Sequence, residues 1–88
     1  MNKRRKDKLK KIIEKLNALK DELLGITDDE IAEYDCIEAT TNLLAMPFSK
    51  RPQYIKKMQR WQYVIKNLHS AFLGLDTAID EITEAIER

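Results

Sequence analysis

Residues 54–86 read YIKKMQRWQYVIKNLHSAFLGLDTAIDEITEAI, with large apolar residues at alternating intervals of three and four positions. The spacing persists for nearly five heptads, which is typical of the a and d positions of a coiled-coil seam. It predicts one long helix over about residues 50–88, interrupted at most by a bend at Gly74, since glycine costs about 1 kcal/mol relative to alanine. The expected seam residues are Tyr54, Met58, Trp61, Ile65, Leu68, Phe72, Leu75, Ile79, Ile82 and Ile86.

A third apolar column runs beside this seam and repeats every seven residues. A seam between two helices needs only the a and d positions, so the wider stripe indicates more than one neighbouring helix. We therefore expect two or more copies of the chain to assemble, with two hairpins forming a four-helix bundle as a homodimer or a higher oligomer. The column consists of Val64, Ala71, Ala78 and Ala85.

Upstream of the long helix, the sequence has one clear turn, Pro47-Phe48-Ser49, with Ser49 as the expected N-cap and Pro52 in the first helical turn. Two further helices are predicted, over about residues 7–24 and 28–46. Gly25 separates them, and Thr27 to Glu30 read as a capping box for the second. Expected core residues of these helices are Leu9, Ile12, Leu16, Leu19, Leu23 and Ile26, followed by Ile31, Tyr34, Ile37, Leu43, Leu44 and Met46.

The 88 residues include 16 Lys or Arg and 15 Asp or Glu, and these charges are segregated along the chain. Residues 3–11 and 50–66 are basic, whereas residues 21–38 and 76–87 are acidic. Folding the chain once at the Pro47 turn places each basic block beside an acidic one. The sequence therefore predicts a single all-α domain, residues 1–88, built as a long antiparallel hairpin. The alternative is a three-helix bundle in which Gly25 folds the first helix back.

Few residues here carry catalytic or metal-binding chemistry. The chain has one His, one Cys and two Gly, and no glycine-rich phosphate loop. His69 has no second ligand at metal-binding spacing and is expected at the edge of the core, and Cys36 is expected to pack as a small, partly buried side chain. No apolar run approaches the ~18 residues of a membrane span. We expect no enzyme, metal, cofactor or membrane segment, and a reducing bacterial cytoplasm as the location.

Residues 49–63 combine Lys and Arg with three of the six aromatic residues. Such a patch suits a protein contact or stacking on a base next to a phosphate. Tyr54 and Trp61 also fall on the seam, so a role in the core is the alternative for these two. The candidate binding residues are Lys50, Arg51, Tyr54, Lys57, Arg60, Trp61 and Tyr63.

The N-terminal residues Lys3, Arg4 and Arg5 form a second candidate, an arm that binds phosphates or another anionic surface. The alternative is structural, because this basic helix start would already face the acidic block 76–87. Nucleic acid bound here would be held without sequence specificity. The acidic half of the chain disfavours it as the main partner.

Both ends of the chain resemble small coiled-coil proteins of temperate phages and prophages of Gram-positive bacteria. This resemblance implies a phage accessory protein that binds and inhibits a host protein, such as a defence component. A different class of function, an oligomeric sponge for a nucleotide immune signal, remains the alternative, and a nucleic-acid-binding regulator is a weaker one. The similar segments are Asn2 to Lys6 with Leu9, Ile12, Ile13, Leu16, Leu19 and Lys20; Asp28 to Glu30 with Tyr34 and Asp35; and Asn67, Leu68, Ala71, Leu75, Ala78, Ile79, Ile82 and Ala85 to Glu87.

Overall fold

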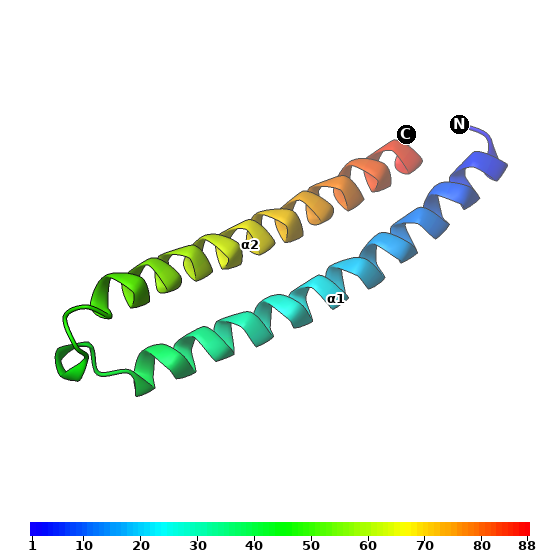
Figure 1. Cartoon of the computed structure of the whole chain (residues 1–88). Coiled ribbons are helices and arrows are strands. Elements are labelled where there is room, and N and C mark those ends of the chain that lie inside the picture. Colours follow the sequence, from blue (N-terminus) through cyan, green and yellow to red (C-terminus); the bar gives the residue numbers. More distant parts are fainter.

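The computed structural model describes all 88 residues as two long helices joined by a short loop (Figure 1). Helix α1 spans Lys3–Thr40 and helix α2 spans Arg51–Glu87, with a short 3-10 helix, η1, at Leu43–Ala45 between them. Both chain ends lie at the same end of the molecule, so the helices are antiparallel (Figure 1). The molecule measures 66 × 16 × 13 Å. The all-α prediction and the antiparallel hairpin are confirmed.

The prediction of two separate helices before the turn is wrong, because α1 continues through Gly25. Thr27 does not cap a new helix. Its hydroxyl donates a hydrogen bond to the Leu23 carbonyl 2.7 Å away, one turn back in the same helix. Packing of α1 along the full length of α2 outweighs the small intrinsic cost of one glycine. The alternative three-helix bundle is excluded by the same continuity.

The boundaries of α1 also differ from the expected ones. The helix begins at Lys3, because the Asn2 side chain accepts a hydrogen bond from the Arg5 amide at 2.9 Å and acts as the N-cap. It ends at Thr40 and not at Met46, because Thr41 and Asn42 adopt extended backbone conformations. The Asn42 side chain then caps η1 by accepting from the Leu44 amide at 3.1 Å.

Helix α2 agrees with the sequence except at its first residues. Ser49 is not the N-cap, because Lys50 occupies that position and makes no side-chain capping hydrogen bond. Pro52 lies in the first turn, as predicted. The helix runs through Gly74 without interruption.

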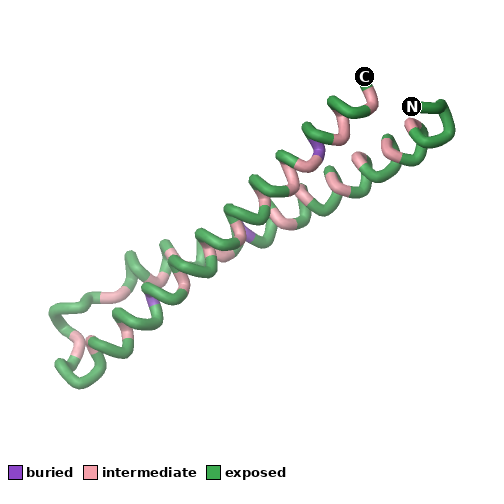
Figure 2. Tube along the Cα trace, turned by 90° about the horizontal axis from the view of Figure 1, so that it is seen from above, coloured by how far each residue is buried: buried purple, intermediate pink, exposed green.

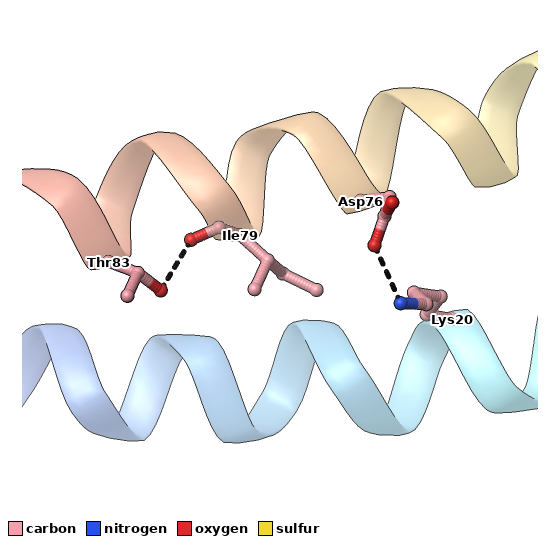
Figure 3. Close-up of polar contacts among 4 residues, drawn as sticks. All are labelled: Lys20, Asp76, Ile79 and Thr83. Carbon is pink, nitrogen blue, oxygen red and sulfur yellow. Dashed lines mark hydrogen bonds and ion pairs between the residues drawn. The ribbon is translucent and has the colours of Figure 1, made fainter.

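The two helices meet along a seam with a strict heptad spacing. Every predicted α2 seam residue is buried or half-buried. On α1, however, the residues that face α2 include Ile13, Lys20 and Thr27, whereas Ile12, Leu19 and Ile26 are exposed. Two adjacent columns of α1 compete for the seam. The column that contains Lys20 faces α2, and Lys20 therefore lies beside Asp76 (Figure 3). The half-buried or buried α1 residues are Lys6, Leu9, Ile13, Leu16, Lys20, Leu23, Thr27, Glu30, Tyr34 and Ile37.

The core of the isolated hairpin is thin. Only Met58, Ile79 and Thr27 are buried, and they lie at separate points along the seam (Figure 2). Thr27 is 3% exposed, and its back-bonded hydroxyl leaves no unsatisfied polar group in the seam. Since no side chain is fully enclosed, a single chain has little apolar burial with which to offset the conformational entropy lost on folding.

Candidate partner-binding surfaces

The predicted basic-aromatic patch divides into an inner and an outer part. Trp61 faces α1, where its indole nitrogen donates a hydrogen bond to Glu30 Oε2 at 2.7 Å. Its ring packs edge-on against the Tyr34 ring, with the ring centres 5.6 Å apart. Tyr54 is also half-buried on the seam. These two aromatic residues therefore belong to the seam between the helices.

Arg51 holds the loop together. Its guanidinium group donates to the Met46 carbonyl at 3.0 Å and to the Leu44 carbonyl at 2.9 Å, and it lies 4.0 Å from the centre of the Phe48 ring. A guanidinium group with two carbonyl acceptors and an aromatic ring has little freedom left. Arg51 thus acts first as a structural clamp of the loop.

The outer part of the patch is open to solvent. Lys50, Lys57, Arg60 and Tyr63 are all exposed. Arg60 and Tyr63 lie in a shallow hollow on one side of α2, and Lys57 lies in a neighbouring hollow that also includes Arg60. Lys50 is the N-cap of α2, and Lys57, Arg60 and Tyr63 lie on the outer surface of its first four turns.

The loop end exposes two large apolar side chains that the sequence analysis did not assign to a site. Leu44 is 85% exposed and Phe48 is 81% exposed. The backbone beneath them is fixed by Arg51, by the Asn42 cap and by a 2.9 Å hydrogen bond from the Lys50 amide to the Pro47 carbonyl. We call Leu44 and Phe48 on this loop the apex. Leu44 was expected in the core, but α1 ends before reaching it.

The N-terminal residues Lys3, Arg4 and Arg5 form the first turn of α1 and are exposed. None of them pairs with the acidic residues at the end of α2. The only ion pair between the two helices joins Lys20 and Asp76 at 2.7 Å (Figure 3). The facing charge blocks thus leave most of their charges free for other contacts.

Lys20 lies in the seam with its ammonium group between Asp76 and the Phe72 ring, 5.3 Å from the ring centre. The hydrogen bond to Asp76 is the main cause that raises the pKa of Lys20 above its ordinary value of 10.5. Partial burial opposes this, and Asp21 and Asp80 add to the increase. A charged Lys20 is thus favoured by folding.

This pair predicts a specific pH dependence. A pKa raised on folding stabilises the folded state fully below pH 10.5, and the contribution is lost as the pH rises through the folded-state pKa. We expect Asp76→Asn to lower the free energy of unfolding by a constant amount between pH 7 and 10, and by a shrinking amount above pH 10.5. Urea titrations of both proteins across this range measure the difference. A difference already lost at pH 9 contradicts the role assigned to the pair.

The remaining reactive side chains lie apart from one another. Cys36 is exposed and not partly buried as expected. His69 is exposed and stacks against Phe72, with ring centres 6.5 Å apart. No group of three His, Cys, Asp or Glu side chains is arranged to hold a metal ion. Neither helix contains a stretch that is both long and apolar enough to cross a membrane.

These features describe an elongated two-helix hairpin with an apolar apex and a basic surface beside it. No protein-family model, curated protein or solved structure matches the chain.

Proposed function

We propose that this chain is a non-enzymatic binding protein that docks the apex of its hairpin onto another protein. The observation that carries the proposal is the exposure of Leu44 and Phe48 on a loop held by Arg51. Rigid aromatic and aliphatic side chains lose little conformational entropy on binding and are typical anchors of protein interfaces. The fitting partner offers an apolar pocket for these two side chains.

The charges around the apex narrow the class of partner further. Lys50 lies at the N-cap of α2, Lys57 and Arg60 follow within its first three turns, and no acidic residue occurs between residues 39 and 75. A partner with an acidic rim around its pocket would therefore be attracted and oriented by this surface. The resemblance to phage coiled-coil proteins supports a host protein in the cytoplasm of an infected bacterium, such as a defence component, which the hairpin inhibits by occupying it.

Assembly is part of the proposed function. The functional unit is a homo-oligomer in which hairpins pack into a four-helix bundle. The support for this is the thin core of one chain, in which Met58 and Ile79 are the only buried apolar residues. An assembly would also present two or more apices to its target, which increases avidity without new contacts.

Alanine substitutions at the apex test the docking site. We expect Leu44→Ala and Phe48→Ala each to reduce capture of the partner from a Gram-positive host lysate by at least about 10-fold, the effect of losing roughly 1.4 kcal/mol from one anchor. The matched control is Leu73→Ala, because Leu73 is also an exposed apolar residue but lies on the body of α2. Quantitative mass spectrometry of the captured proteins gives the ratio. Equal losses with the control, or no loss at the apex, would refute the docking site.

A second candidate, binding of a nucleotide signal, is favoured by one observation. Lys56, Gln59, Arg60, Tyr63 and Val64 line a shallow hollow that combines two cations with an exposed aromatic ring. A bound nucleotide would raise the melting temperature, and Arg60→Ala would remove that rise. A panel of linear and cyclic nucleotides that leaves the melting temperature unchanged excludes this candidate.

A further inference from the structure

One side of the hairpin carries an apolar surface that the chain leaves exposed except at Ala78, which is half-buried. On α1 it consists of Ile12, Leu19 and Ile26, each seven residues apart, and Leu19 and Ile26 are 51% and 55% exposed. On α2 it consists of Val64 and the alanines that follow it at seven-residue intervals, Ala71, Ala78 and Ala85. We call these seven residues the open face.

The two columns of the open face lie on the same side of the hairpin. Each of their residues directly precedes a seam residue, as Ile12 precedes Ile13 and Val64 precedes Ile65. In an antiparallel pair, equivalent flanking columns of the two helices meet along one edge. Equivalent columns also meet along the opposite edge of the hairpin. One hollow there is lined by residues of both helices that each directly follow a seam residue, namely Ile31, Gln62 and His69.

The accessible area of the hairpin indicates how much surface a partner would cover. The chain exposes 7000 Å², whereas a compact monomer of this mass exposes about 5,400 Å². A standard protein interface covers about 800 Å² on each partner. The elongated hairpin thus has about 1,600 Å² more surface than a compact monomer, which exceeds the area that one standard interface covers on each partner.

Charges of both signs line the borders of the open face and are segregated along its length. On α1, Lys8 and Lys15 flank Ile12, whereas Glu22 and Asp29 flank Ile26. On α2 the order is reversed in space, with Arg60 one turn from Val64 near the loop and Glu81 near the chain ends. None of these six residues has an ion-pair partner within the hairpin. A second hairpin turned about the long axis keeps the register set by the Lys20–Asp76 and Tyr34–Gln62 pairs, so Lys15 lies level with Glu81 and Asp29 lies within about two turns of Arg60.

The side-chain sizes, and not the charges, distinguish the two possible orientations of a second hairpin. The α1 half of the open face carries large residues, and the α2 half carries mainly alanines. Rotation about the long axis sets the large residues of one hairpin against the alanines of the other, which fills space evenly. The alternative, a rotation about a perpendicular axis, would set large residues against large and small against small.

We infer that a second copy of this chain packs on the open face, with both loops at the same end of a four-helix bundle. This inference rests on the assembly part of the proposed function. It leaves the apex uncovered. Binding of a partner protein at Leu44 and Phe48 is thus a separate property of the dimer.

Light scattering tests whether a second copy of the chain covers the open face. We expect the unmodified chain at micromolar concentration to have twice the 10.3 kDa mass of one chain. Leu19→Glu and Ile26→Glu should each raise the dissociation constant at least about 100-fold, because a charge is placed in an apolar interface. The matched control, Leu73→Glu, changes an equally exposed leucine, 53% exposed, that lies outside the open face, and should stay dimeric. A monomeric unmodified chain, or Glu variants that remain dimeric, would overturn the inference.

The orientation is tested by a spin label on Cys36, the only cysteine, which is exposed. Double electron–electron resonance measures the distance between the spin labels of the two copies. At a rise of 1.5 Å per residue, this distance should be about 15–30 Å with the loops together and about 45–50 Å with the loops at opposite ends. The longer distance, or no dipolar signal, would overturn the orientation. Leu44→Ala and Phe48→Ala should leave the mass and this distance unchanged, so failure of apex docking and failure of dimerisation are distinguishable.

Discussion

Replacing Ile79 with alanine is expected to lower the free energy of unfolding by about 3 kcal/mol, within the usual range for a large-to-small change in a core. Ile79 is one of only two buried apolar residues, and it lies in the α2 half of the seam (Figure 3). Small domains are stable by only about 5–15 kcal/mol, so this loss is a large fraction of the total. Urea unfolding followed by circular dichroism at 222 nm measures it.

The matched control for Ile79→Ala is Leu73→Ala, which removes the same number of carbon atoms from an exposed position of the same helix. We expect the control to change the free energy of unfolding by less than about 0.5 kcal/mol. If both variants lose the same stability, the seam does not hold the helices together in the way described above.

Replacing Gly25 and Gly74 together with alanine is expected to raise the free energy of unfolding by about 2 kcal/mol, roughly 1 kcal/mol for each glycine in a helix interior. Both positions are exposed and lie inside continuous helices. A Cβ atom added at either one meets no atom within 4 Å. The new methyl groups therefore cost nothing in the folded state while they restrict the unfolded chain.

The same denaturation experiment measures the glycine variants singly and together. Additive gains are expected, because the two residues do not contact each other. A loss of stability at Gly25 would instead indicate that α1 must kink there, as the separate helices 7–24 and 28–46 required.

Helix α2 was predictable because its seam positions are apolar throughout, so only one period fits the sequence. Helix α1 was not, since its apolar residues form two adjacent columns and four of its true seam residues are polar, Lys20 and Thr27 among them. Lys20 fits in the seam because its ammonium group contacts Asp76 and the Phe72 ring of α2. Thr27 fits because its hydroxyl donates a hydrogen bond to the Leu23 carbonyl. The capping-box pattern at Thr27 was misleading for a related reason, because packing against α2 continues the helix through it.

The binding surface was predictable only in part. The sequence places Arg51 and Trp61 in one basic-aromatic cluster, but a helix turns successive residues to different sides. Trp61 consequently points to Glu30 of the other helix, and Arg51 to carbonyl groups of the loop. The apex was missed because Leu44 was assigned to a helix core. The run Thr40-Thr41-Asn42 was the available signal, since Asn42 is a good capping residue and two β-branched residues weaken a helix end.

The most direct test of the central claim, that the apex docks onto another protein, is site-specific photocrosslinking in living bacterial host cells. A photoreactive phenylalanine analogue replaces Phe48 in one strain and Leu73 in a second, since both side chains are exposed but only Phe48 belongs to the apex. We predict one discrete adduct with a host protein from position 48 and none from position 73. Equal adducts at both positions, or none at position 48, would contradict the claim.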